Sequence, residues 1–361
     1  MSIAKKIFII SAVLLSAVLF FLGIYNISFK EEKSVKTGTE NSQGNGENES
    51  NNSLDKIEKS KEKIYSLSDE ATIGPNFVDG GESVEYYSKT NGNVFKVFSD
   101  GEGKETISNK NLSGLKNVFW SSDGSKVIAR FNENGKIQYS IYDYKEKRGY
   151  ELSDGIKYAI WNNLGDQIIY TYLDGKTKKI TLNSANFDGK NWKKVSDIGF
   201  GDVFISVVPQ SSLISFWNSP NAFEETSLNV VSTVGGEAKK IFSGRFGADY
   251  LWSPNGSRAL VSYSDSKGGS KISLGIINSN GGEFQNLNIP TFVSKCAWSK
   301  DSKTIYYAVP SFSSENNILP NDYQSGKVST KDTFWKMDIA SGKAERIVEI
   351  KDINSSYDVT N

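Results

Sequence analysis

The side chains that could carry acid–base or nucleophilic chemistry in this chain are carboxylates, amines, hydroxyls and one thiol, because the 361 residues include no histidine. The absence of histidine excludes Ser/His/Asp and Cys/His nucleophile–base arrangements and any histidine-ligated metal site. The single cysteine, Cys296, has no partner for an intrachain disulfide and no histidine base. Its apolar setting, "KCAW", predicts a buried small hydrophobe.

Carboxylates remain as candidates for catalysis. Two of them could cleave a glycosidic bond, but no obvious pair stands out, and Glu224 and Glu225 lie in a polar stretch. The sequence has no Gly-rich phosphate loop between a strand and a helix and no Cys/His cluster. Calcium held by loop Asp side chains and backbone oxygens stays open, although no EF-hand spacing is present. We therefore predict no catalytic residue, no cofactor and no metal, and we expect that the chain is not an enzyme.

The elements that would position these side chains begin after two N-terminal segments. Ile7 to Ile27 carries no charge and is long enough for a transmembrane helix, which needs about 20 apolar residues. Lys5 and Lys6 precede it and favour a cytoplasmic N-terminus. A cleaved signal peptide is the alternative, but the segment ends without an Ala-x-Ala site or a lipobox Cys. We predict a signal anchor over 1–28, followed by a disordered polar linker over 29–63.

A repeated hairpin pattern fills the rest of the chain. The stretch "LWSPNGSRALVSYS" at Leu251 recurs on the order of every 45 residues, an interval typical of propeller blades. Its other copies are "FWSSDGSKVIARF", "IWNNLGDQIIYTY" and "AWSKDSKTIYYAV", with weaker copies at Asn76 and Ser206. An alternating strand, a Gly-bearing turn and a closing strand follow each hairpin, so one unit predicts a four-stranded antiparallel blade.

Turn and packing chemistry explain the residues that the copies share. Pro presets φ at the first corner of a type I turn, Asn or Asp suits the second, and Gly accepts the left-handed conformation that closes it. The Trp offers a large face that can pack between adjacent sheets. We therefore assign structural roles, and not acid or metal-ligand roles, to Trp120, Asp123, Gly124, Trp161, Trp252, Pro254, Asn255, Gly256 and Trp298.

The pattern Trp-Ser-x-Asp/Asn-Gly-Ser, paired with a later Asp/Asn-x-Gly-Gly turn, resembles the WD-like propeller repeats of the TolB type. Phe77 and Val207 replace Trp in two copies, and Leu164 stands where the turn Asp belongs. The fold class that this resemblance implies is all-β: a six-bladed β-propeller of four-stranded antiparallel blades over 64–350, with a C-terminal tail over 351–361. Ring closure has two alternatives, either a strand donated by Ile64–Leu67 to the last blade or closure by C-terminal strands alone.

Two places depart from the repeat and are candidates for binding, since propeller function usually lies in the loops of one face. In the last copy, the segment from Pro310 to Asp332 far exceeds the equivalent loops of the other copies. In the fourth, the stretches "WNSPNAFEET" and "SGRFGADY" place aromatics and an Arg in what we interpret as rim loops. The alternative is that these aromatics only plug the propeller mouth. The candidate partner-binding residues are Trp217, Phe223, Arg245, Phe246, Tyr250 and Tyr323.

Function is expected from binding. Lys plus Arg and Asp plus Glu balance at 42 each, so no nucleic-acid partner is indicated. The first hypothesis is a single-pass membrane protein whose extracytoplasmic propeller binds a protein or peptide partner in the bacterial cell envelope, the role that the TolB resemblance implies. The alternative is an extracytoplasmic propeller that binds, and could act on, a carbohydrate or other ligand, because aromatic rings stack on sugars. A purely structural role in an envelope complex cannot be separated from the first hypothesis on sequence.

Overall fold

The computed structural model describes residues 64–199, 201–312, 314, 316–353 and 355–360. Contacts divide the chain into two units, Met1–Glu58 and Lys59–Asn361, and all described residues belong to the second unit. The predicted anchor at Ile7–Ile27 and the predicted linker over 29–63 lie outside the described residues. Within the described ranges, no helix has the length and apolar character that crossing a membrane requires.

Antiparallel strands make up almost all of the regular structure, as the alternating apolar runs predict. Four sheets have four strands each, and in every one of them the hydrogen-bonded order follows the chain order. The first sheet contains β1 (Thr72–Val78), β2 (Ser83–Ser88), β3 (Val94–Phe98) and β4 (Lys104–Ser108). The second contains β5 (Leu115–Trp120), β6 (Lys126–Glu133), β7 (Lys136–Asp143) and β8 (Arg148–Glu151). The third contains β9 (Ile156–Trp161), β10 (Gln167–Leu173), β11 (Ile180–Asn186) and β12 (Lys193–Ile198). The last contains β20 (Cys296–Trp298), β21 (Thr304–Phe312), β22 (Thr330–Asp338) and β23 (Ala344–Arg346).

A seven-stranded sheet lies between the third sheet and the last one. Its strands are β13 (Val203–Val207), β14 (Leu213–Asn218), β15 (Glu225–Ser232), β16 (Lys239–Trp252), β17 (Arg258–Ser264), β18 (Ile272–Asn278) and β19 (Gln285–Ile289). The structure thus has four separate four-stranded sheets where six were predicted. The reason is β16, which pairs with β15 up to Phe246 and with β17 from Phe246 onward. A bulge between Phe246 and Asp249 bends this strand without ending it.

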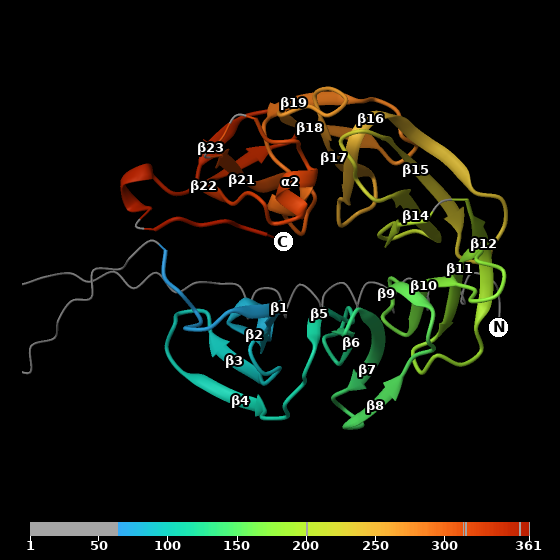
Figure 1. Cartoon of the computed structure of the whole chain (residues 1–361). Helices are drawn as coiled ribbons and strands as arrows, with labels where there is room; N and C mark the ends of the chain where they lie inside the picture. The colour runs from blue at the N-terminus through green and yellow to red at the C-terminus, as the bar shows by residue number, and fades with distance from the viewer. Residues whose placement is uncertain (1–63, 200, 313, 315, 354, 361) are drawn as a thin grey trace, which may run out of the picture. The chain divides into compact units, whose positions relative to one another are not determined.

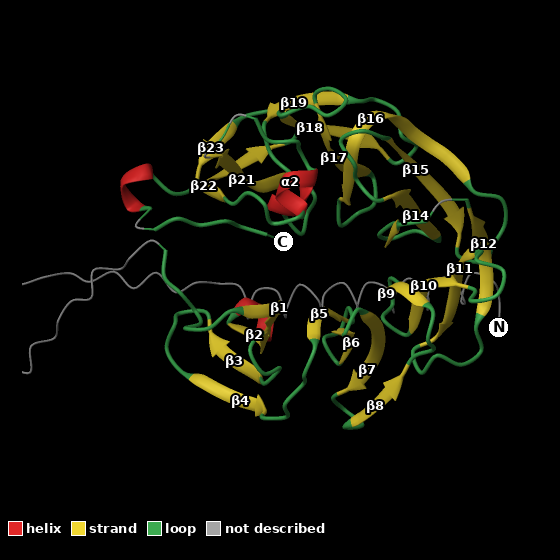
Figure 2. Cartoon of the chain, in the orientation of Figure 1, coloured by secondary structure: helices red, strands yellow, loops and turns green. Residues whose placement is uncertain are grey.

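The sheets are arranged as in a propeller. They follow one another in chain order along an arc, and β1, β5 and β9, the first strands of the first three sheets, lie on its inner side (Figure 1). Helical turns are few and short (Figure 2). They are η1 (Asp79–Gly81), η2 (Val293–Lys295), α2 (Asn321–Gln324) and η3 (Ile350–Asp352). The fold is therefore all-β and propeller-like.

The hairpin turns of the repeat hold their shape by side-chain hydrogen bonds. The Asp123 carboxylate accepts bonds from the Ser125 N–H at 3.0 Å and from the Ser121 hydroxyl at 2.7 Å. These bonds hold the pKa of Asp123 well below its ordinary value. At Gly256, φ is +66° and a Cβ would lie 2.1 Å from the carbonyl oxygen of Pro209, in the preceding hairpin. Only glycine fits this close contact between neighbouring turns.

The tryptophans of the repeat join each hairpin unit to the one before it. The Trp161 indole N–H donates to the carbonyl of Phe119 in the second sheet at 2.8 Å, and within the seven-stranded sheet the Trp252 indole N–H donates to the hydroxyl of Ser215 at 2.8 Å. Each indole therefore packs against the preceding unit with its polar atom satisfied. Cys296 is buried in the last sheet, where its thiol donates to the carbonyl of Phe292 at 3.2 Å and burial raises its pKa.

The chain ends pack on different sheets. Ile64–Leu67 forms no strand; the Tyr65 hydroxyl donates to the carbonyl of Ser99, and Leu67 packs on the first sheet. All strands of the last sheet come from the C-terminal part of the chain. Of the two modes of ring closure left open by the sequence, strand donation by Ile64–Leu67 does not occur.

Candidate functional site

A cavity of about 790 Å³ opens where strands β13, β16 and β17 meet two later segments of the chain. One is the cap, which we define as residues 316–329 between β21 and β22, and the other is the tail, residues 355–360. The cavity is lined by three aromatic rings, two carboxylates and five hydroxyls: Phe204, Phe292 and Tyr323; Asp249 and Asp358; Ser219, Ser262, Ser294, Ser329 and Thr360. Ligand sites have this size and this mixture of apolar wall and few polar groups.

A smaller cavity of about 340 Å³ lies between the first and second sheets. Its walls are mainly rings and aliphatic side chains, among them Tyr87, Leu112, Phe131 and Tyr142. It is a gap between two blades, away from the cap and the tail, so the larger cavity is the candidate site.

Asp249 is the ionisable group on the wall formed by β16. Its Oδ1 accepts hydrogen bonds from the Trp217 indole N–H and the Tyr250 backbone N–H, both at 3.0 Å. Burial raises the pKa of this carboxyl from its ordinary 3.8 to about 6, and the two hydrogen bonds offset only part of that shift. Among the residues that the structure describes, no group bonds to Oδ2 and no cation pairs with this carboxylate. A carboxyl with a raised pKa in a cavity is a candidate functional group.

Phe204 forms the aromatic wall next to Asp249. Its ring stacks on Tyr158 with centroids 5.9 Å apart and meets Trp217 edge-on at 6.2 Å. Such aromatic pairs fix the orientation of a ring. Phe204 is partly exposed, so part of its ring faces the cavity.

The cap closes over the cavity by reaching two neighbouring loops. The Asn321 side-chain carbonyl accepts from the backbone N–H of Ala222 at 2.7 Å, and its amide donates to Asn221 at 3.1 Å. The Leu319 N–H donates to the carbonyl of Gly269 at 3.0 Å. The cap therefore connects the last sheet to loops of the seven-stranded sheet, at the face where the loops between second and third strands lie.

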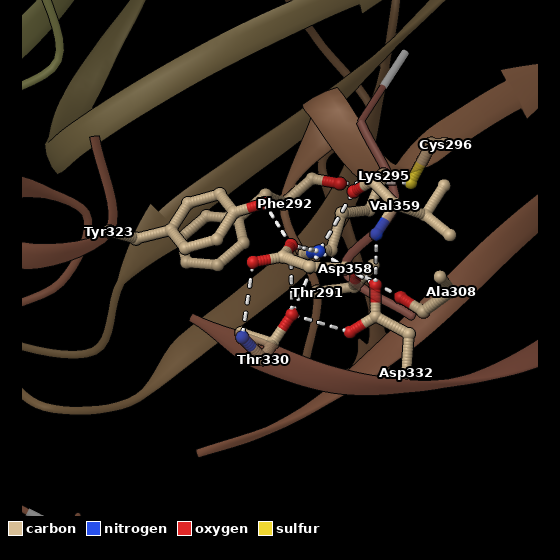
Figure 3. A network of polar contacts seen from close by, with 10 residues as sticks. All are labelled: Thr291, Phe292, Lys295, Cys296, Ala308, Tyr323, Thr330, Asp332, Asp358 and Val359. Carbon is tan, nitrogen blue, oxygen red and sulfur yellow. Dashed lines mark hydrogen bonds and ion pairs between the residues drawn. The ribbon is translucent and has the colours of Figure 1, made fainter. Parts of the chain in front are cut away.

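The tail is held by a buried charge network around Lys295 (Figure 3). The Lys295 ammonium group, whose side chain is fully buried, lies 2.7 Å from both Asp332 and Asp358. It also donates to the Thr330 hydroxyl at 3.0 Å and to the Val359 carbonyl at 2.8 Å. All four of these partners come from β22 and the tail, so the network fixes the C-terminal end of the chain against the last sheet.

The ionisation of this network follows from its hydrogen bonds. Burial alone would lower the pKa of Lys295, but its bonds to Asp332 and Asp358 hold that pKa above its ordinary value. Burial alone would raise the pKa of Asp358, but bonds from Lys295, Tyr323 and the Thr330 N–H hold it below its ordinary value. The pair is therefore ionised at neutral pH. The Tyr323 ring lies flat on Phe292 with centroids 4.7 Å apart, and its hydroxyl donates to Asp358 at 2.8 Å.

The structure places the candidate binding residues in different environments. Tyr323 lines the cavity, as part of the long segment of the last sheet. Phe223 is 47% exposed and its ring lies over Gly268. Arg245 and Phe246 belong to β16, where the Arg245 guanidinium lies 4.6 Å from the ring centroid of Phe284.

The structure contradicts two predictions: the placement of Trp217 and Tyr250 in rim loops, and the length of the loop in the last copy. Trp217 and Tyr250 were assigned to polar rim loops, but they lie in strands β14 and β16 and are 4% and 5% exposed. Their rings meet edge-on at 5.4 Å in the core of the seven-stranded sheet. The long loop is also shorter than predicted, because β21 and β22 pair as far as Phe312 and Thr330.

Asp249, Lys295 and Asp358 were not predicted as site residues. Asp249 and Lys295 each stand three positions before the repeat Trp, where two other copies have Tyr158 and Phe204. A charge three positions before the repeat Trp was therefore a signal that could have found them. No comparable signal points to Asp358, whose partners lie 28 to 63 residues away. In the part of the chain that the structure describes, no group of three or more Asp, Glu, Cys or His side chains could hold a metal ion.

Comparison with known proteins identifies the fold class as a β-propeller: the β-propeller domain of the Trilobed protease from Pyrococcus furiosus resembles the chain with a TM-score of 0.50 and 12% identity, over 77% of this chain and 83% of that one. An oligogalacturonate lyase from Vibrio parahaemolyticus resembles the chain with a TM-score of 0.55 and 12% identity, over 78% of this chain and 80% of that one. An acylaminoacyl peptidase from Pyrococcus horikoshii resembles it with a TM-score of 0.51 and 13% identity, over 77% of this chain and 46% of that one.

TolB-like propellers are also among the similar solved structures. TolB from Acinetobacter baumannii has a TM-score of 0.48 and 14% identity, over 70% of this chain and 58% of TolB. The chain thus spans less than two thirds of that protein. No protein-family model and no curated protein matches the chain.

The prediction that the chain is not an enzyme, made from the missing histidine and the lack of a recognisable catalytic constellation, is wrong. The structures that share the fold include a lyase and a peptidase, both enzymes by name. At 12% and 13% identity these likenesses show the fold alone, since one fold carries many activities.

Proposed function

We propose that this chain is a ligand-binding β-propeller that takes a small polar molecule or a short peptide segment into the cavity below the cap. The observation that carries this proposal is the cavity itself, where Asp249 and Phe204 face a space of about 790 Å³. Two segments that the repeat does not require, the cap and the tail, complete its walls. Segments added to a common fold, such as the cap and the tail, often form its functional site.

The protein-partner and carbohydrate hypotheses both fit this cavity. A peptide segment of an envelope protein could enter it, with Phe223 and Tyr323 near the entrance loops providing further contact. A saccharide would use the serine hydroxyls and the exposed part of the Phe204 ring. The burial of Trp217 and Tyr250 leaves the cavity, and not an aromatic rim patch, as the basis for either hypothesis.

A plugged variant tests the proposal. Ser294 lines the cavity and is partly exposed, so Ser294→Trp places a large ring inside it. Val234 is 93% exposed on a turn that does not line it, and Val234→Trp is the matched control. We expect that amino acids, amines, saccharides or short peptides that raise the melting temperature of the native protein and the control leave Ser294→Trp unchanged. Ligands that stabilise all three proteins equally would contradict the proposal.

We also propose that Ile7–Ile27 anchors the chain and that the propeller lies outside the cytoplasm. The support is the uncharged N-terminal segment with two lysines before it. Protease added to intact cells should then digest the propeller, while a cytoplasmic protein remains intact. Full protection until the cells are lysed would contradict this location.

A six-bladed ring is the arrangement that we propose for the strands. The support is the register of β16, whose first half closes the unit begun by β13 and whose second half begins the unit ended by β19. An experimental structure with six pseudo-equivalent units around one axis is the expected result.

A further inference from the structure

The Asp249 carboxylate lacks a counter-charge. Its Oδ1 is satisfied by the Trp217 and Tyr250 N–H groups, while Oδ2 has no partner among the described residues. Burial of an unpaired carboxylate is unfavourable unless it is protonated or meets a cation. The cavity therefore contains a place where a cation would be stabilised.

The other walls of the cavity add negative and not positive charge. Among the described residues that line it, none is Lys or Arg. Lys295 supplies the ammonium group of the tail network. Its side chain has no exposed surface, and its ion pairs are with Asp332 and Asp358. Its one ammonium group is thus already paired, and the network offers no free positive charge to the cavity. An anionic ligand would be repelled from such a cavity, and a cationic one would be attracted.

The wall beside Asp249 is apolar. The Phe204 ring is partly exposed there, and a ring face attracts an ammonium group and packs against the methylene or methyl carbons attached to it. We propose that the cavity recognises an alkylammonium group, with Asp249 as its counter-ion and Phe204 as the apolar contact. This inference rests on the proposed function and specifies its ligand class. The raised pKa of Asp249 supports it, because a bound cation would restore the ionised form.

Two sources could supply this group: a free amine, or a lysine side chain of a peptide. Isothermal titration of the purified full-length protein at pH 7.5 can test both with matched probes. Choline is compared with its uncharged carbon analogue 3,3-dimethylbutanol, and the peptide Gly-Lys-Gly is compared with the same peptide carrying acetyl-lysine. We expect at least one cationic probe to bind ~10-fold or more tightly than its neutral match, the range of a desolvated cation–π and ion-pair contact.

Variants assign the preference to the carboxylate. Asp249→Asn keeps the shape and the acceptor oxygen but removes the charge, so the ~10-fold preference should disappear. Asp123→Asn, a change in an exposed hairpin turn, should leave it intact. Preference for choline identifies a free amine as the source, and preference for the lysine peptide identifies a peptide side chain.

The outcomes separate this inference from the proposed function. Equal binding of charged and neutral probes, lost in Ser294→Trp, would overturn the alkylammonium inference and leave the cavity as a ligand site. A charge preference that persists in Asp249→Asn, or no binding of either cationic probe, would also overturn it. Binding that Ser294→Trp leaves unchanged would contradict the proposed function as well.

Discussion

At the scale of single residues, Asp249 is a buried carboxyl whose ionisation opposes folding. Because its pKa is raised from 3.8 to about 6, the folded state holds a proton more tightly than the unfolded state does. The free energy of unfolding therefore falls as pH rises from about 4 to about 6. A shift of about two pKa units corresponds to ~3 kcal/mol of destabilisation at neutral pH.

Asp249→Asn should remove this conflict. Asn cannot ionise and can still accept from Trp217 and Tyr250, so we expect the variant to be ~1 to 3 kcal/mol more stable than the native protein at pH 7.5. The gain should shrink toward zero at pH 4. Urea denaturation at several pH values measures it, and a difference that does not change with pH would contradict the explanation.

Asp301 is a control for this prediction, because its pKa is shifted in the opposite direction to that of Asp249. Its carboxylate accepts from the Ser299 hydroxyl and the Lys303 N–H, and these bonds lower its pKa. A lowered pKa contributes stability above the ordinary pKa of Asp, and that contribution is lost as pH falls through the lowered value. Asp301→Asn should therefore reduce stability at pH 7.5 and lose its effect in acid.

At the scale of elements, β16 shows what the sequence could and could not predict. The repeat predicted the strands before and after each Trp, because alternation and turn chemistry are local properties. It did not predict that Ser243–Tyr250 continues as strand. That stretch was interpreted as a rim loop, but the positive φ values of its two glycines, +81° at Gly244 and +56° at Gly247, bend a strand that stays paired.

The candidate site was only partly predictable for a related reason. The long segment of the last copy stood out by length, and Tyr323 in it does line the cavity. Burial of Trp217 depends on contact with Tyr250 across the sheet, and the Lys295 network joins β22 and the tail. Such contacts between distant residues leave no local pattern in one sequence.

Gly247 couples β16 to the cap. A Cβ at this position would lie 2.6 Å from Cδ of Pro320 in the cap and 3.3 Å from the Ala222 backbone nitrogen. Gly247→Ala should cost ~1 to 3 kcal/mol through backbone strain and this clash, and it should push the cap away from the loop that contains Ala222. Hydrogen exchange of the α2 amides should then become faster.

Gly244→Ala is the matched control for this prediction. Gly244 also has a positive φ, but nothing lies within 4 Å of its Cβ position. It should therefore show the strain without the effect on cap exchange. Equal acceleration of α2 exchange in both variants would show that the cap responds to general destabilisation and not to this contact.

At the scale of the whole molecule, the first and last sheets share no hydrogen-bonded strand within the described ranges, so the C-terminal end depends on the tail. The tail lies along β22 through the bond from the Asp332 N–H to the Tyr357 carbonyl at 2.9 Å, and Asp358 and Val359 complete the shell of Lys295. Asp358 and Thr360 of the tail also line the cavity below the cap. Tail, last sheet and cavity should therefore lose order together.

Truncation after Ile353 tests this dependence. It removes Asp358 and the Val359 carbonyl, two of the four acceptors of the Lys295 ammonium group, and leaves it only Asp332 and the Thr330 hydroxyl. Partial loss of a buried ion network should destabilise the last sheet by ~3 kcal/mol or more. Hydrogen exchange should become faster in β20–β23 and the cap, while β5–β12 keep their protection. Removal of residues 360–361 alone keeps these bonds and is the control. Faster exchange spread evenly over all sheets would mean that the strands unfold as one unit and that the tail does not hold the last sheet in particular.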